Sequence, residues 1–226
     1  MTVREATPTL DRDGAMLIPG VVASVLPTIE AALATVPIER AGVRLHGVAA
    51  LRDLLAPGGA IGAIAGDVLG PETRPVRALL FDKSAATNWA LGWHQDRTIV
   101  VREGRDVPGF GPWTVKQGLQ HVAPPFALLE TMVTLRVHLD PVPLDNAPLL
   151  VALGSHRLGR IAESVVEAVV GASHVHACLA QRGDVWLYAT PILHASDAAK
   201  RPTRRRVLQV DFAAQPLPGG LAWLGV

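Results

Sequence analysis

The chain has 226 residues, of which 49% are hydrophobic, and its 21 basic and 20 acidic residues leave a net charge of +1. So small a net charge produces no global field that would attract nucleic acid or an anionic membrane, and we expect neither as a partner. The one basic run, Arg204-Arg205-Arg206, is better explained as a strand start with a solvated rim than as a nucleic-acid patch. The hydrophobic fraction is enough for a sizeable core, and the length fits one large domain or two small ones.

Three features bear on the location of the protein. Cys178 is the single cysteine, so no internal disulfide can form, which favours a reducing compartment. The first ten residues lack a basic segment followed by an apolar one, so we expect no secretory signal peptide. No apolar run approaches the roughly 18 residues of a membrane-spanning helix. Together these features predict a cytoplasmic protein.

The N-terminal third of the sequence favours helices. Residues 1–20 have the character of an arm that ends at Pro19-Gly20. Beyond it, apolar residues recur at helical spacing and glycine or proline separates the segments. The expected helices cover residues 21–35, 48–55 and 60–69. Residues 1–70 are therefore expected to contribute a helical layer.

From residue 71 onward the pattern changes to short extended segments bounded by turn residues. The clearest alternation lies in residues 128–140, where apolar and polar side chains take opposite faces, as in a strand that lines a cavity. The apolar face carries Leu135, Val137 and Leu139, and the polar face carries Thr134, Arg136 and His138. The expected strands cover residues 73–82, 93–101, 128–140, 149–153, 174–179, 184–188, 192–196 and 205–212, with a helix over 161–170.

Helices followed by about eight short strands predict a mainly β fold, a double-sheet jelly roll with the N-terminal helices packed on one sheet. We expect a single domain over residues 1–226, with the jelly-roll core over 71–214. Residues 102–127 contain four prolines and four glycines. A segment this long and broken is expected to be a loop that forms a lid or an insertion over a site.

The stretch Trp93-His94-Gln95-Asp96 carries the candidate chemistry. Side chains two apart on an extended segment point to the same side. His94 and Asp96 can therefore aim at one point, while Gln95 points away or to the rim. With His194 from a remote strand, three groups can occupy one face of an octahedral metal. Two histidines and one carboxylate leave three positions open, as is typical of non-haem Fe(II) oxygenases.

A second histidine pair has the same spacing. His174 and His176 also lie two apart, but a cupin metal site would need a glutamate three or four residues further on. Leu179 and Ala180 stand there instead. We therefore do not expect this pair to be metal ligands.

Several motifs occur in an order that resembles a known family. They are Phe81-Asp82-Lys83, Asn88-Trp89, Trp93-His94-Gln95-Asp96, Asp145-Asn146, Gly154-Ser155-His156-Arg157, Gly183-Asp184-Val185, Leu193-His194-Ala195-Ser196 and Arg204-Arg205-Arg206. In this order they are similar to the phytanoyl-CoA dioxygenase family, whose members are Fe(II)- and 2-oxoglutarate-dependent oxygenases on a double-stranded β-helix. The resemblance covers roughly residues 10–214.

The resemblance implies a role for individual residues. His94, Asp96 and His194 would hold the iron. Arg205 would pair with the distal carboxylate of 2-oxoglutarate, for which the guanidinium fork is well suited. The other residues implied at the cosubstrate are Ser196 as a hydrogen-bond donor, Gln95 as a contact, Leu79 with Phe81 as apolar wall, and Arg136, where some members carry an aromatic residue.

The sequence departs from the family pattern at two further places. Asn146-Ala147 stands where the family usually has Asn-Gly. Leu153 stands where a proline often precedes the Gly-Ser-His motif. Neither departure removes an implied ligand.

The resemblance implies a dioxygenase that hydroxylates an unidentified small molecule, consumes O2 and 2-oxoglutarate, and releases succinate and CO2. Asp96 argues against the related halogenases, in which a missing carboxylate makes room for halide. Two alternatives stay open at this point. One is a non-catalytic jelly-roll module that binds metal or ligand, and the other is a Zn(II)-dependent hydrolase that uses the same three ligands.

Overall fold

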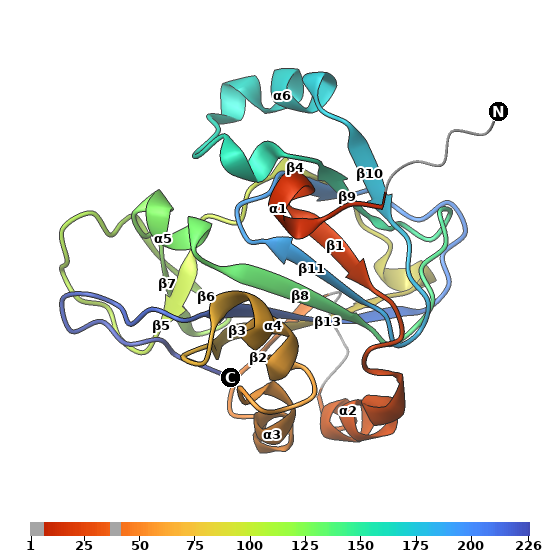
Figure 1. Ribbon diagram of the computed structural model, residues 1–226, viewed down its shortest axis with the longest axis horizontal. Helices are drawn as coiled ribbons and strands as arrows, with labels where there is room; N and C mark the ends of the chain where they lie inside the picture. Colours follow the sequence, from red (N-terminus) through yellow and green to blue (C-terminus); the bar gives the residue numbers. More distant parts are fainter. Residues whose placement is uncertain (1–6, 37–41) are drawn as a thin grey trace.

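The computed structural model describes residues 7–36 and 42–226, whose strands form three antiparallel sheets (Figure 1). The six-stranded sheet has the order β1-β11-β8-β13-β3-β2, the four-stranded sheet β10-β9-β12-β4 and the three-stranded sheet β5-β7-β6. The strands are β1 (Ala15–Ile18), β2 (Gly42–Leu45), β3 (Arg74–Lys83), β4 (Leu91–His94), β5 (Ile99–Val101), β6 (Trp113–Lys116), β7 (Leu119–Val122), β8 (Val133–His138), β9 (Leu149–Ala152), β10 (Val175–Cys178), β11 (Val185–Ala189), β12 (His194–Ser196) and β13 (Arg205–Ala213).

Three helices cover the outer face of the six-stranded sheet, on the side away from the four-stranded sheet (Figure 1). Apolar side chains of these helices pack against the sheet, and Ile29, Leu208 and Phe212 are fully buried there. Burial of apolar surface is the main favourable term in folding. The helices are α2 (Leu26–Leu33), α3 (Arg52–Leu55) and α4 (Gly62–Leu69). The expected mainly β fold with helices on one sheet is confirmed.

The remaining helices are short. They are α1 (Leu10–Asp13), α5 (Phe126–Glu130) and α6 (Val166–Ala172), with 3-10 helices at Ala23–Val25, Ala49–Leu51, Ala85–Thr87, Ser155–Arg157 and Glu163–Val165. The helix expected over 21–35 thus begins as a 3-10 turn, and α2 starts only where Pro27 occupies its first turn. Proline is favoured at that position because its missing N–H would have no partner there.

Strand β8 separates the helical layer from the interior between the sheets. Leu135 and Val137 belong to the core under the helices. Thr134, from the opposite face, donates to Asp211 and accepts from Thr190, away from that core. The alternation predicted for this strand is confirmed, but its start was wrong. Residues 128–130 belong to α5, which follows two prolines.

The prediction of an arm over residues 1–20 is wrong for residues 7–20, the part of this segment that the structure describes. Residues 10–13 form α1, and β1 pairs antiparallel with β11, so that Ala15 lies opposite Tyr188. β1 pairs with a segment that is remote in the sequence. A strand of only four residues shows too little alternation to be predicted from the sequence. The prediction that there is no signal peptide rests on residues 1–10, which lie largely outside the described ranges. It stays a prediction.

The strand predicted over 93–101 is broken in two. β4 ends at His94, and β5 belongs to the three-stranded sheet, so Asp96 lies on the irregular segment between them. Residues 102–127 are not a structureless loop, because β6 and β7 form a hairpin there. Its turn is made by Gln117 and Gly118, both with positive φ, which glycine adopts readily.

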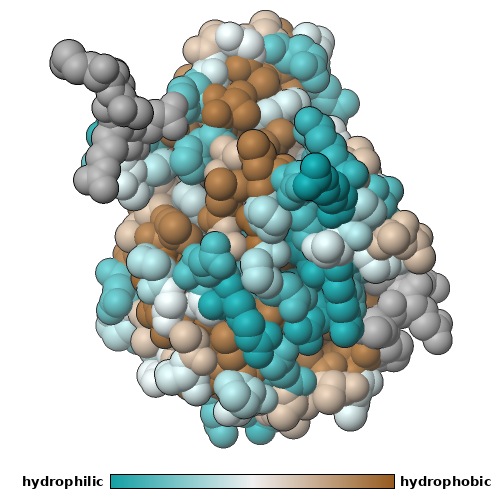
Figure 2. Space-filling view, turned by 90° about the vertical axis from the view of Figure 1, so that its right-hand side faces the viewer, coloured by the Kyte–Doolittle hydropathy of each residue, from teal (hydrophilic) through white to brown (hydrophobic). Residues whose placement is uncertain are grey.

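The surface seen from the right-hand side of Figure 1 mixes hydrophilic and hydrophobic residues, with a hydrophilic band beside a hydrophobic strip (Figure 2). Exposed large apolar side chains come from several elements, among them Val115, Leu144 and Leu179. Such exposure is common on protein surfaces. Within the described ranges, the helices are all too short or too polar to cross a membrane.

Candidate metal and cosubstrate site

Three candidate metal ligands meet at one point between the two larger sheets. His94 ends β4 and His194 begins β12, and the pairing of these strands sets the two residues opposite each other. Their ring centroids lie 4.3 Å apart. With Asp96, they form a group in which one donor atom of each residue lies within 4.8 Å of the others. The alternative pair, His174 and His176, belongs to no such group among the described residues.

Backbone carbonyls orient both imidazole rings. Nδ1 of His94 lies 2.8 Å from the carbonyl oxygen of Gly92, and Nδ1 of His194 lies 2.9 Å from that of Ile192. Because a carbonyl only accepts, each Nδ1 carries the proton and donates it. The Nε2 lone pairs are then free to bind a metal, which is the usual arrangement at metal-bound histidines. Burial and the neighbouring His94 lower the pKa of His194 to about 4, so its ring is neutral near pH 7, as a ligand must be.

Arg77 holds the third ligand. Its NH2 group lies 2.8 Å from Oδ2 of Asp96, and its Nε lies 2.5 Å from Oδ2 of Asp211. Burial favours the neutral acid, but Arg77 and the two histidines outweigh it and lower the pKa of Asp96 to about 2. Asp96 is therefore a carboxylate, and its Oδ1 has no partner among the described residues. That donor set, two imidazoles and one carboxylate, fits Fe(II) with open positions.

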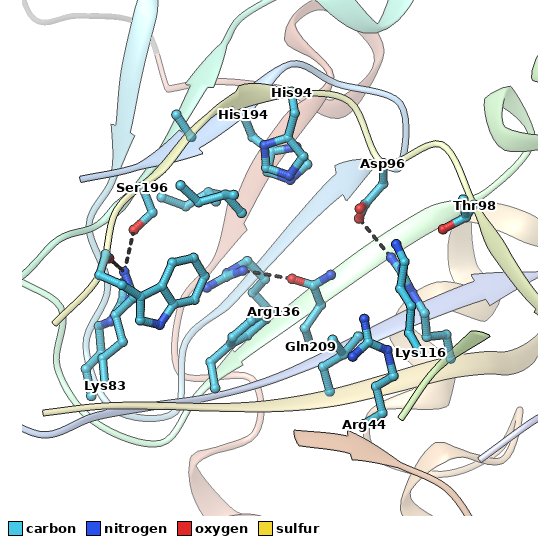
Figure 3. A pocket seen from close by; sticks show the side chains of 18 residues that line it. Arg44, Lys83, His94, Asp96, Thr98, Lys116, Arg136, His194, Ser196 and Gln209 are labelled. Atoms are coloured by element: carbon cyan, nitrogen blue, oxygen red, sulfur yellow. Dashed lines mark hydrogen bonds and ion pairs between the residues drawn. The ribbon is translucent and has the colours of Figure 1, made fainter. Parts of the chain in front are cut away.

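The three ligands line a cavity of about 390 Å³ (Figure 3). Most of the residues that the resemblance places at the iron or the cosubstrate line this cavity, namely His94, Asp96, His194, Arg205, Ser196, Leu79 and Arg136. The sequence therefore predicted residues that the fold does bring together.

Gln95 is the exception, and the expected cosubstrate contact is corrected. Its side chain is buried with its amide donating to the carbonyl oxygens of Gly159 and Pro191, at 3.0 and 2.8 Å. Its Oε1 accepts from the backbone N–H of Ile161 at 2.9 Å. Every polar atom of this side chain is thus bound to backbone outside the cavity. Gln95 anchors the irregular segment that carries Asp96.

Three cations, Lys83, Arg136 and Arg205, face the cavity and form no salt bridge with any carboxylate of residues 7–36 and 42–226. Arg205 donates to the carbonyl oxygen of Ala147, and Arg136 donates to Gln209 at 2.8 Å. The Nε atoms of both arginines are buried with no hydrogen-bond partner. Lys83 donates to the carbonyl oxygen of Trp89 at 2.7 Å and to Ser196 at 3.3 Å.

Burial and repulsion between neighbouring cations lower the pKa values of Lys83 and Arg205. Burial, together with Arg205 and Arg136, lowers the pKa of Lys83 to about 8. Burial and Arg136 lower the pKa of Arg205 to about 9. Buried charge without a counter-charge is costly. A dianion such as 2-oxoglutarate would supply that counter-charge, so the residues present fit this cosubstrate.

The basic run around Arg205 follows the alternation of a strand. Arg204 pairs with Asp82 at 2.9 Å, and Arg206 pairs with Asp140 at 2.7 Å and with Glu30 at 2.9 Å. Arg205, between them, turns into the cavity. The outer two arginines are thus matched by carboxylates, in agreement with a strand start at a solvated rim.

Sequence reasoning missed further lining residues. Arg77 could have been found, because it shares the two-residue period of Leu79 and Phe81 along β3, and all three line the cavity. Arg44 and Lys116 come from β2 and β6. Neither has a spacing relation to the metal motif in the sequence, so no local signal could have placed them.

Similar folds occur among solved structures. The epimerase SnoN in complex with Fe3+, alpha ketoglutarate and nogalamycin RO matches with 18% identity and a TM-score of 0.64, over 93% of this chain and 88% of that chain. EctD from S. alaskensis in its apoform matches with 17% identity and a TM-score of 0.65, over 100% and 84%. AviO1 from Streptomyces viridochromogenes Tue57 matches with 20% identity and a TM-score of 0.61, over 92% and 95%. At these identities the likeness shows the fold.

Comparison with curated protein sequences finds no significant match. A family model, described as phytanoyl-CoA dioxygenase (PhyH), matches residues 52–207, which is more than half of the chain. The matched region contains both histidines and the carboxylate of the metal group, as well as Arg205. The chain belongs to the phytanoyl-CoA dioxygenase family.

Proposed function

We propose that this protein is an Fe(II)- and 2-oxoglutarate-dependent dioxygenase that hydroxylates a small molecule in the cytoplasm and releases succinate and CO2. The observation that carries the proposal is one cavity that combines a two-histidine, one-carboxylate group with buried cations that have no carboxylate partner in the described part of the chain. Similar folds have been solved with Fe3+ and alpha ketoglutarate in SnoN and with nickel and 2-oxoglutarate in HygX from Streptomyces hygroscopicus.

Each part of the site has a distinct task in this proposal. His94, Asp96 and His194 would hold the iron, which when bound supplies the activation of O2 and of the 2-oxo acid. Arg205 and Lys83 would bind the distal carboxylate of 2-oxoglutarate, and the hydroxyl of Ser196, 3.3 Å from Nζ of Lys83, would orient that ammonium group.

Apolar side chains line the same cavity as these polar groups. Leu79, Phe81 and Leu149 line it together with the metal group. Apolar walls limit the water around a bound reactant, which strengthens its electrostatic contacts and protects reactive species from side reactions. The cavity thus provides the conditions that an oxygenase requires.

A zinc hydrolase with the same ligands would need no dianion. The unpaired Nε atoms of Arg136 and Arg205 would then have no task. Replacement of Arg205 by alanine separates the two possibilities. In the oxygenase it weakens 2-oxoglutarate binding, whereas in the hydrolase it leaves turnover unchanged.

The direct test is succinate formation from 2-oxoglutarate by the Fe(II)-loaded protein, with a panel of small molecules as substrates. We expect the Asp96→Ala variant to lose coupled turnover, because it removes a metal ligand and leaves Arg77 without that partner. Asp67→Ala, an exposed position on α4, is the matched control and should behave as the wild type. Undiminished hydroxylation by the Asp96→Ala variant would refute the proposal.

A further inference from the structure

The cavity contains a second group of cations, apart from the one proposed for 2-oxoglutarate. Figure 3 shows Arg44 and Lys116 near Asp96 and Thr98, whereas Lys83 and Ser196 lie at the other side, with Arg136 between. We call Arg44 and Lys116 the distal cation pair. The two residues come from different sheets, β2 and β6, and both line the cavity.

A buried histidine orients Arg44. Nε of Arg44 lies 3.4 Å from Nε2 of His121, and Nδ1 of His121 lies 2.9 Å from the carbonyl oxygen of Leu119. The carbonyl can only accept, so Nδ1 carries the proton and Nε2 accepts from the guanidinium. Burial lowers the pKa of His121, and the nearby cations Arg44, Arg77 and Lys116 act in the same direction, so the ring is neutral. The two terminal amino groups of Arg44 have no side-chain or backbone acceptor among the described residues.

The β6–β7 hairpin brings Lys116 to the same place. Oε1 of Gln117, in the hairpin turn, accepts from the backbone N–H of Arg44 at 3.1 Å. Nε2 of Gln117 donates to the carbonyl oxygen of Gly42 at 3.3 Å. Two hydrogen bonds from the Gln117 side chain thus attach the turn to β2. Lys116, the preceding residue, is exposed and lines the same cavity as Arg44. The backbones of the two residues are therefore held together, while the long side chain of Lys116 can adjust to a ligand.

Among the described residues, the distal cation pair forms no salt bridge. The one acidic side chain of the described residues that lines the cavity is Asp96, and its oxygen Oδ2 is engaged by Arg77. The cationic side chains that line it are Arg44, Arg77, Lys83, Lys116, Arg136 and Arg205. A bound 2-oxoglutarate would direct one carboxylate to the iron and the other to Arg205 and Lys83. Neither carboxylate would reach the distal cation pair, so this pair would stay open to a second anion.

We infer that the substrate is an organic anion whose carboxylate or phosphate group binds to Arg44 and Lys116, while its reacting carbon lies beside the metal group. This inference rests on the proposed function and names its substrate class. A guanidinium with two free amino groups suits either anion, since both offer paired oxygens. Lys116 adds a point charge whose amino group can adapt to one or the other.

The test uses the protein loaded with Fe(II) and one equivalent of 2-oxoglutarate, without O2. Inorganic phosphate, phenylacetate and the neutral benzyl alcohol are titrated separately by calorimetry. We expect phosphate or phenylacetate to bind at one site per chain, and the one that binds tells which anion the site prefers. Benzyl alcohol should bind much more weakly, because it offers no charge to the pair.

Variants assign that binding to the distal cation pair. Arg44→Gln and Lys116→Gln should each weaken anion binding about 10-fold or more, the usual effect of losing a charge-assisted hydrogen bond. Arg44→Lys should retain part of the affinity. Arg52→Gln, at an exposed position of α3, is the matched control and should change nothing. Lys116 is exposed, so its variant remains informative if Arg44→Gln fails to fold.

The outcomes separate this inference from the proposed function. Normal 2-oxoglutarate binding without binding of either anion would overturn the inference alone, and so would anion binding of equal strength in Lys116→Gln and the wild type. Failure to bind 2-oxoglutarate would overturn the proposed function and the inference with it. In a substrate screen, the compounds that stimulate succinate release should be anions. A neutral substrate turned over equally by Lys116→Gln would contradict the inference.

Discussion

Lys83 has a lower pKa than Arg205, its neighbour in the cosubstrate part of the cavity. Its pKa is lowered to about 8 by burial and by Arg205 and Arg136. Only the protonated form attracts an anion, so the affinity for 2-oxoglutarate should be highest below pH 8 and fall as the pH rises through that value. Calorimetric titrations on both sides of pH 8 measure this.

The Lys83→Gln variant should lose this pH dependence and bind more weakly than the wild type below pH 8, with the difference narrowing above that pH. The exposed Lys200→Gln variant is the matched control and should keep it. An equal fall in affinity above pH 8 for Lys83→Gln would assign the titration to another group.

Ala147 occupies a conformation that alanine rarely adopts. Its φ is +52°, and it stands where the family usually has glycine. Removing the methyl group relieves a strain of about 1 kcal/mol but gives up about 0.8 kcal/mol of burial, so Ala147→Gly should leave the free energy of unfolding nearly unchanged. Ala152→Gly, at a buried position in β9, should cost about 1 kcal/mol or more, because it has no strain to relieve. Denaturant unfolding of both variants provides the comparison, and equal losses would contradict it.

At the scale of elements, Gln117 makes two hydrogen bonds that attach the β6–β7 hairpin to β2, in addition to the contact between Arg44 and His121. Gln117→Gly suits the φ of +51° but removes both side-chain hydrogen bonds to Gly42 and Arg44. The backbone N–H of Arg44 then has no acceptor from the turn, and we expect its hydrogen–deuterium exchange to become faster. Val115→Ala, a 62% exposed position in the same hairpin, is the control. Equal exchange in the two variants would show that the hairpin is held by other contacts.

Elements with strong local periodicity could be predicted from the sequence. α4, β3 and β8 lie close to their expected positions because apolar residues repeat along them at helical or strand spacing. β1 and β2 were missed, since each has four residues and forms an edge of the six-stranded sheet. The sequence predicts a loop over residues 102–127, where β6 and β7 form a hairpin. Its prolines and glycines lie at its ends and in its turn, where they do not interrupt the strands.

At the scale of the whole molecule, the site depends on pairings between distant segments. His94 and His194 meet because β4 pairs with β12, and the family resemblance anticipated this convergence. Arg44 and Lys116 meet because a hairpin turn is attached to β2, which no motif indicated. Gln95 lies in the metal motif but faces away, because its amide is bound by backbone groups of another segment. Long-range contacts therefore decide which polar residues reach the cavity.

The central claim is that one metal and one cosubstrate bind together in this cavity. Calorimetric titration of 2-oxoglutarate into the Fe(II)-loaded protein without O2 tests it most directly. We expect one site per chain, loss of binding in His194→Ala, binding weakened about 10-fold or more in Arg205→Ala, and wild-type binding in the control His174→Ala. Binding of 2-oxoglutarate that is equally tight without iron, or in the His194→Ala variant, would contradict the account.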